Sequence, residues 1–409
     1  MNIEELFAGI GVVIDDRVFS KDENDDKIVT IVKQLEEENH FPLVKYATFP
    51  SSEKLQKLNN VSFLLLDWEI DNRENILGDD GMMVSMPDSL KQNNKEEVVK
   101  IVQIFLQNNL APIFIFSNQD INIIKKDLRS AGIDITKCSV FVESKASLDG
   151  DGKLFKKIEE WVNSVSGVYV AKAWENALNK AKNQFFVEMA TNSSHWPKAL
   201  HKAAIADSTD FGAVLTQTLA QNIISRMLPI DIRDEQMDKD SNTIERREVR
   251  AIIKGQFFME PASEASIVGD FYIIKDSGHK KKYYMNIRPT CDCVNREGND
   301  GDIHLLECTP ITSKQEIELF ENGHFKETIG CAIIGPLYGN KVYRINFKTI
   351  RIEPYLSQKE NKKGRILSPA INHVTERYSL YVQRQALPRL PQEILQEVSS
   401  ENADERSGV

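Results

Sequence analysis

Five polar side chains lie at the ends of short, mainly apolar runs in the first third of the chain. They are Asp15 and Asp16 after GVVI, Asp67 after FLLL, Ser117 after IFIF, and Lys145 after VFVES. An aspartate can attack a phosphoryl donor and form an aspartyl-phosphate. A lysine can offset the charge on the transferred group, and a hydroxyl can hydrogen-bond one of its oxygens. These residue types favour phosphoryl transfer to Asp67, with Ser117 and Lys145 contacting the transferred group.

The three carboxylates of this set need a cation if they lie together. Like charges repel one another at close range, and Mg²⁺ prefers oxygen ligands and water in an octahedron. We expect Asp16 and Asp67 to bind Mg²⁺ directly, and Asp15 to bind it directly or through water. The backbone carbonyl of Glu69 would complete the protein ligands.

Strand and helix patterns alternate along residues 1–165. Continuous or near-continuous apolar runs predict strands at 11–15, 43–49, 63–67, 112–117 and 139–145. Amphipathic patterns predict helices at 26–39, 96–109, 121–132 and 152–165. Such β-α units predict a flavodoxin-like α/β domain, a five-stranded parallel sheet of order 2-1-3-4-5. Ligands bind such sheets at the carboxyl ends of the strands, where all five polar groups would lie.

The series Asp-Asp, Asp, Ser and Lys at successive strand ends resembles the signature of response-regulator receiver domains of two-component signalling. The resemblance covers about residues 1–165 of the 409. It implies that Asp67 is the phosphoacceptor, that Mg²⁺ is the cofactor, and that a partner histidine kinase supplies the phosphoryl group. It also implies a protein that catalyses only its own phosphorylation and dephosphorylation.

The sequence departs from the receiver pattern in three places. Asp67 and Ser117 are farther apart than in receivers, which indicates an insertion at about 71–94. Ala146 stands where receivers generally have a proline. Phe141 lies near the position of the aromatic switch residue that many receivers carry, but the pattern does not establish which face of the sheet it occupies.

A different class, the haloacid-dehalogenase-like phosphatases, also places a nucleophilic Asp after an apolar strand. Two features count against that class. Position 69 is Glu rather than the Asp that serves as general acid, and the acidic pair Asp15 and Asp16 precedes the nucleophile instead of following it. A second alternative is a DNA-binding transcriptional regulator whose output domain has no recognisable motif.

The remaining chain changes in pattern. Residues 166–255 are expected to form a helical linker or middle domain, whose apolar stripe at 211–227 fits a domain core or a dimerisation helix. Residues 256–396 predict a small β-rich, barrel-like domain with a terminal helix, and polar residues 397–409 a disordered tail.

Four residues of the β-rich region invite a zinc interpretation, namely Cys291, Cys293, His304 and Cys308. Their spacing differs from that of the usual zinc fingers and ribbons, and buried thiols in strands are the simpler interpretation. Whether they bind metal stays open at this point. Five scattered cysteines suit a reducing compartment better than a disulfide framework.

Composition narrows the partners. A net charge of −10 makes a nucleic-acid partner an unfavoured expectation, and no apolar run is long enough to span a membrane. We therefore expect a cytoplasmic protein that signals through protein contacts, to a downstream effector or within a homodimer. A long receiver without a familiar output domain resembles those of bacterial phage-defence systems of the Detocs type. That resemblance implies a regulatory receiver or a phosphate sink in antiviral defence.

Overall fold

The computed structural model divides into two compact units, Met1–Asn242 and Thr243–Val409. The residues whose structure is described are 3–20, 27–58, 60–70, 88–136, 139–148, 152–207, 209–238, 243–260, 266–276, 278–289, 292–293, 301–324 and 326–384. Both the predicted tail at 397–409 and residues 71–87 of the predicted insertion lie outside these ranges. Residues 88–94 of that insertion belong to a long helix.

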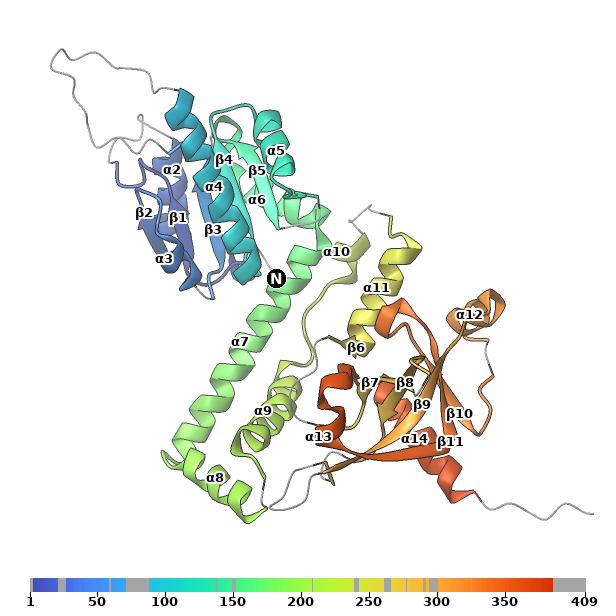
Figure 1. Cartoon of the computed structure of the whole chain (residues 1–409). Coiled ribbons are helices and arrows are strands. Elements are labelled where there is room, and N and C mark those ends of the chain that lie inside the picture. The colour runs from blue at the N-terminus through green and yellow to red at the C-terminus, as the bar shows by residue number, and fades with distance from the viewer. Residues whose placement is uncertain are drawn as a thin grey trace, which may run out of the picture. The chain divides into compact units, whose positions relative to one another are not determined.

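A five-stranded, all-parallel sheet forms the centre of the first unit (Figure 1). Its order is β2-β1-β3-β4-β5, which confirms the order predicted from the sequence. The strands are β1 (Gly11–Ile14), β2 (Leu43–Tyr46), β3 (Phe63–Asp67), β4 (Ile113–Ser117) and β5 (Val140–Ser144). β1, β3 and β4 are buried along their whole length, as expected of parallel strands covered on both faces.

Helices cover both faces of this sheet (Figure 1). They are α1 (Ile3–Leu6), α2 (Lys27–Lys33), α3 (Ser52–Gln56), α4 (Asp88–Asn108), α5 (Ile121–Ser130) and α6 (Lys153–Ser164). Helix α2 continues into a π-helical turn, Gln34–Glu38. Side chains alternate between two cores, so that on β3 Leu65 joins the core of α2 and α6 while Leu64 and Leu66 join the core of α4 and α5.

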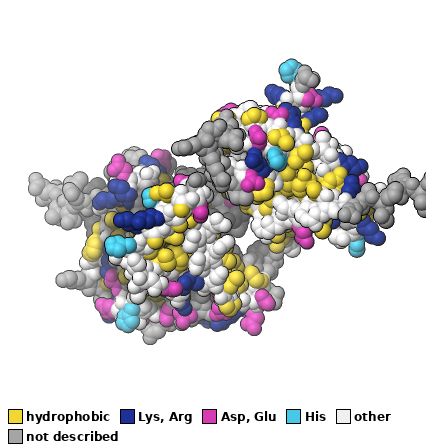
Figure 2. Space-filling view, turned by 90° about the horizontal axis from the view of Figure 1, so that it is seen from below, with side chains coloured by type: hydrophobic (Ala, Val, Ile, Leu, Met, Phe, Trp, Pro, Cys, Tyr) yellow, Lys and Arg dark blue, Asp and Glu magenta, His cyan; other side chains and the backbone are white. Residues whose placement is uncertain are grey.

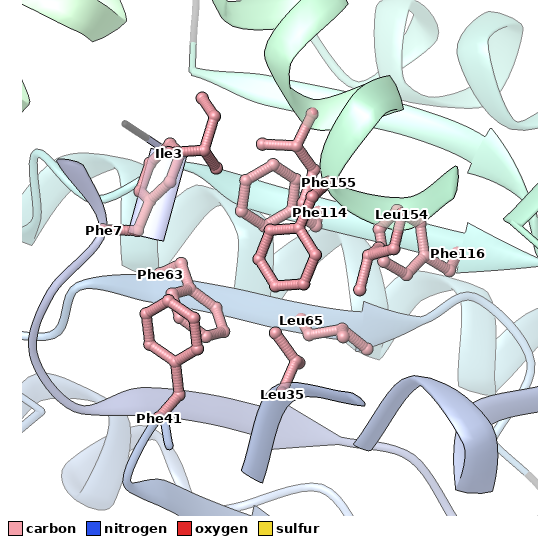
Figure 3. A pocket seen from close by; sticks show the side chains of 11 residues that line it. Ile3, Phe7, Leu35, Phe41, Phe63, Leu65, Phe114, Phe116, Leu154 and Phe155 are labelled. Carbon is pink, nitrogen blue, oxygen red and sulfur yellow. The ribbon is translucent and has the colours of Figure 1, made fainter. Parts of the chain in front are cut away.

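A small apolar cavity lies in the α2–α6 core (Figure 3). Its volume is about 20 Å³, and every residue that lines it is apolar. Phe63 and Leu65 of β3, with Phe114 and Phe116 of β4, form the sheet side of its wall. A space of this size admits about one water molecule, but a water needs polar partners that this wall does not offer.

The core of the first unit continues beyond residue 165 into helix α7 (Ser166–Asn192). Val168, Tyr169 and Ala173 are buried in the same cluster as Phe116. The Asn176 side chain donates hydrogen bonds to two carbonyls of the N-terminal segment, Glu5 at 3.0 Å and Leu6 at 3.1 Å. Helices α8 (Trp196–Ala206), α9 (Phe211–Met227) and α10 (Asp234–Asp238) follow.

The second unit contains a separate antiparallel sheet of order β10-β11-β9-β8-β7-β12-β6, in agreement with the predicted β-rich region. The strands are β6 (Phe258–Met259), β7 (Asp270–Lys275), β8 (Lys281–Asn286), β9 (Asp302–Pro310), β10 (Cys331–Ile334), β11 (Tyr343–Pro354) and β12 (Lys362–Ile366). The helices are α11 (Arg246–Phe257), α12 (Lys314–Glu321), α13 (Tyr355–Gln358) and α14 (Ala370–Gln383). Ala370, Ile371 and Val374 of α14 pack into the larger of its cores.

Across the described parts of both units, no helix combines the length and the apolar character needed to cross a membrane.

Candidate functional site

The structure places the predicted site residues at the carboxyl edge of the parallel sheet. Asp15 follows β1, Asp67 ends β3, and Ser117 ends β4. Lys145 directly follows β5 and opens a short 3-10 helix, Lys145–Leu148. In the strand register Asp67 lies opposite Phe116, and Ser117 lies opposite Ser144, the neighbour of Lys145. The topology therefore brings together groups that are far apart in the sequence.

The Lys145 ammonium lies between two of the carboxylates. Its Nζ is 2.9 Å from Asp15 Oδ2 and 2.8 Å from Asp67 Oδ2. All three residues are buried, with 1% of Lys145, 0% of Asp15 and 6% of Asp67 exposed. A lysine and carboxylates are rarely buried so deeply unless they are paired.

Backbone groups fix the second oxygen of each carboxylate. The Glu69 N–H donates to Asp67 Oδ1 at 3.1 Å, and the Arg17 N–H donates to Asp15 Oδ1 at 2.8 Å. Each donor lies two residues after its acceptor, as in the Asx-turns that commonly form where a strand ends. These bonds set the orientation of both carboxylates.

Asp16 completes an acidic group that could hold a metal ion. One carboxylate oxygen from each of Asp15, Asp16 and Asp67 lies within 4.8 Å of the others. Asp16 is half-buried, while the other two are buried. Like charges this close repel one another, and oxygen ligands in this number suit a hard cation. No other such group of His, Cys, Asp and Glu occurs among the described residues.

The burial of this group changes the acid–base properties of Asp67 and Lys145. Burial raises the pKa of Asp67 to about 7; Lys145 lowers it in part, and Asp15 adds to the rise. For Lys145, burial acts to lower the pKa, but Asp67 and Asp15 outweigh it and raise the pKa above its usual value. Lys145 therefore stays an ammonium near neutral pH, while Asp67 can gain a proton when no cation is bound.

Ser117 is fully buried, and its hydroxyl oxygen accepts a hydrogen bond from the Gln119 N–H at 3.1 Å. The hydroxyl can still donate to an acceptor. The Gln119 side chain also donates to the exposed Glu69 side chain, joining the loops after β4 and β3. Sequence reasoning missed Gln119, because a glutamine in a loop carries no distinguishing pattern.

Phe141, considered above as an aromatic switch residue, is partly buried and packs against the α2–α6 core. Its ring lies 5.3 Å from that of Trp161 and 6.2 Å from that of Phe114. These contacts place Phe141 of β5 at the border of that core.

The cysteines of the second unit make separate local contacts. The Cys293 thiol accepts from the Asn286 amide at 3.4 Å, whereas the Cys308 thiol donates to the Leu306 carbonyl at 3.6 Å within a hydrophobic core. Cys293, His304 and Cys308 are not grouped closely enough to share a metal ion. Cys291 lies outside the described residues.

No protein-family model matches this chain, and a search of curated proteins finds no match either.

Proposed function

We propose that the first unit is a phosphoacceptor receiver, in which Asp67 takes a phosphoryl group from a partner histidine kinase in the presence of Mg²⁺. The observation that supports it best is the position of the Lys145 ammonium, within 2.9 Å of both Asp15 and Asp67 at the carboxyl edge of the sheet. A nucleophilic carboxylate, an acidic cation site and a fixed ammonium are the parts that phosphoryl transfer to aspartate needs.

In the proposed reaction an oxygen of Asp67 forms a bond to phosphorus, and the bond between phosphorus and the donor's leaving group breaks. Asp15, Asp16, Asp67 and the Glu69 carbonyl would hold Mg²⁺, which supplies charge neutralisation when bound. Lys145 would remain fixed by Asp15 and donate to the oxygens of the transferred group. The Ser117 hydroxyl would donate to another of these oxygens, since its own oxygen already accepts from Gln119.

The signal would pass to other proteins through contacts of the chain. Phe116 precedes Ser117 and shares a core with Val168 and Tyr169 of α7. A shift of Ser117 toward a phosphoryl group can therefore act on α7 through packed side chains. By its resemblance to phage-defence receivers, the chain would serve as a regulatory receiver or phosphate sink in a cytoplasmic bacterial defence system, upstream of a separate effector.

The test is phosphorylation of the purified chain by a small acyl-phosphate donor and by candidate histidine kinases, followed by intact-mass analysis. We expect the mass of one phosphoryl group to appear with Mg²⁺ and to be absent after chelation. Asp67→Asn should abolish the adduct. Asp120→Asn is the matched control, because Asp120 caps α5 near the site and Asn is an equally good N-cap.

An adduct that persists in Asp67→Asn would contradict the proposal, as would failure with every donor while the chain is folded. Steady release of phosphate from simple monoesters would instead indicate a phosphatase. A salt-sensitive complex with duplex DNA would indicate a transcriptional regulator.

A further inference from the structure

Strand β11 extends beyond the strand that pairs with it on one side. β10 pairs with residues 343–346, and the last bond across this pair runs from the Phe347 N–H to the Gly330 carbonyl at 3.0 Å. Farther along, β11 pairs with β9 alone over residues 350–354. All residues of 348–352 are exposed, including Ile350 at 41% and Ile352 at 58%. Figure 1 draws β11 at the lower border of this unit, and Figure 2, viewed from below, shows hydrophobic side chains gathered on that face.

The backbone of Ile352 points away from β9. Its opposite residue, His304, directs both backbone groups toward β8: the His304 N–H donates to Asn286 Oδ1 at 3.0 Å, and its carbonyl accepts from the Ile287 N–H at 2.8 Å. In an antiparallel ladder, two opposite residues either bond to each other or both point away. Ile352 therefore presents its N–H and C=O on the outer edge, and alternation gives Ile350 the same direction.

The contact at the end of the strand agrees with this assignment. The Tyr355 N–H donates to the Gly301 carbonyl at 3.1 Å, so the backbone N–H of Tyr355 points toward the β9 side. By alternation, the backbone groups of Glu353 and Arg351 also point toward β9. Among the described residues no strand pairs with the outer edge of 350–354. Within the described part of the chain, the exposed residues Ile350 and Ile352 therefore carry outward backbone N–H and C=O groups that no strand pairs with.

The free edge is bounded at both ends. The Lys348 N–H donates to Asn346 Oδ1 at 3.0 Å and is already used. Pro354 has no N–H to offer. Charged residues and proline at sheet edges limit indiscriminate pairing. A partner strand can therefore pair only with the short segment 349–353.

This segment complements itself. Ile350-Arg351-Ile352 reads the same in both directions, so two antiparallel copies centred on Arg351 would place Ile350 opposite the partner's Ile352. The outward N–H and C=O of these residues would then bond reciprocally across the pair. Each Arg351, whose Nε is 2.5 Å from its own Glu353, would lie diagonal to the partner's Glu353. The pairing joins apolar to apolar positions. It also places the two Arg351 residues directly opposite each other, and the two Glu353 carboxylates offset the repulsion between the guanidinium groups.

We propose that residues 349–353 of β11 form a homodimer interface, in which two copies of this chain join their seven-stranded sheets edge to edge. The two-fold symmetry closes the contact, because each copy uses its only free segment of this strand.

The test measures self-association of the full chain by sedimentation velocity over a range of concentrations. We expect a concentration-dependent dimer whose formation slows hydrogen exchange at the Ile350 and Ile352 amides. Ile352→Pro removes an outward N–H without removing a bond to β9. The dimer loses two hydrogen bonds as a result, and we expect its dissociation constant to rise about thirtyfold.

A second variant, I350K/I352K, places like charges opposite each other and should also yield monomers. Leu356→Lys is the control, since Leu356 is 57% exposed in α13 and lies outside the pairing segment. The proposal is overturned if the chain is monomeric throughout, or if a dimer forms equally well in both variants. The proposal would also be overturned if the Ile350 and Ile352 amides exchanged their hydrogens slowly at every protein concentration. Another part of the same chain would then cover the edge.

Discussion

The ammonium of Lys145 is the single cation between two buried carboxylates, and its removal would leave Asp15 and Asp67 facing each other. Breaking a buried ion pair by removing one partner costs much more than losing an exposed pair, because a charge stays buried without compensation. Lys145 is therefore as much a structural residue as a proposed catalytic one.

We predict that Lys145→Met lowers the free energy of unfolding by about 3 kcal/mol or more near pH 8 in the presence of a chelator. The comparison variant is Lys157→Met. The Lys157 side chain is 40% exposed, and its Nζ lies 3.7 Å from Glu143 Oε2. That change should cost less than about 1 kcal/mol. Urea unfolding measures the free energy of unfolding of both variants. Equal losses would show that the stability of the buried cluster does not depend on the Lys145 ammonium.

The raised pKa of Asp67 predicts a pH dependence of stability. Its ordinary pKa is 3.8 and its folded-state value is about 7, so the folded chain holds this proton more tightly than the unfolded chain does. In metal-free buffer, unfolding free energy should therefore fall as pH rises from about 4 to about 7, and Asp67→Asn should remove this fall. Mg²⁺ binds the ionised form, so its stabilising effect should grow over the same pH range. A wild-type profile with the same slope as Asp67→Asn would contradict the assignment.

Sequence reasoning placed Asp15, Asp67, Ser117 and Lys145 together because parallel strands share one carboxyl edge, and the structure brings them to that edge. The residue types alone could not predict that the ammonium bridges two carboxylates, or that Gln119 links the β3 and β4 loops. Such contacts depend on loop geometry, which has no periodic pattern. They become visible only in three dimensions.

At the level of elements, β1 depends on close packing at Gly11. A Cβ at this position would overlap the Phe63 ring of β3, and would lie 2.7 Å from Leu43 Cδ2 of β2. The Phe63 ring also lines the apolar cavity (Figure 3). Gly11 thus allows large side chains of the two neighbouring strands to meet over β1.

We predict that Gly11→Ala lowers the free energy of unfolding by about 1–3 kcal/mol, because the added methyl group overpacks a close-packed core. Gly167→Ala provides the contrast, since a Cβ there meets nothing within 4 Å near the start of α7. Alanine at an open helical position should be neutral or stabilising. Thermal unfolding of both variants decides the point, and equal effects would mean that the strands move apart at little cost.

The sheet was predictable because β1 and most of β3 and β4 are continuously apolar and the longer helices have periodic apolar positions. The short helix α3 was not, because Ser52–Gln56 offers a single turn of pattern. The packing of α7 into the first core was also missed, since an amphipathic helix shows which of its faces is apolar but not what that face meets. The first residues of α4 were assigned to an insertion, because the polar stretch at 88–94 lacks apolar spacing.

At the level of the whole molecule, every residue of the candidate site belongs to the first compact unit. We predict that the fragment 1–242 is phosphorylated to the same extent as the full chain by the same donor and Mg²⁺. The fragment should also be monomeric at concentrations where the full chain dimerises through β11. Intact-mass analysis and sedimentation of the fragment test both statements, and loss of phosphorylation in a folded fragment would show that the second unit contributes to the site.

The shared core of the sheet and α7 has a consequence for building hybrid proteins. A junction placed after residue 165, where the α/β repeat ends, would separate Val168, Tyr169 and Ala173 from the cluster that contains Phe116. It would also remove Asn176, which holds the carbonyls of Glu5 and Leu6. A hybrid that transfers the first unit to another chain should therefore use a junction after residue 242, so that α7 stays with the sheet against which it packs.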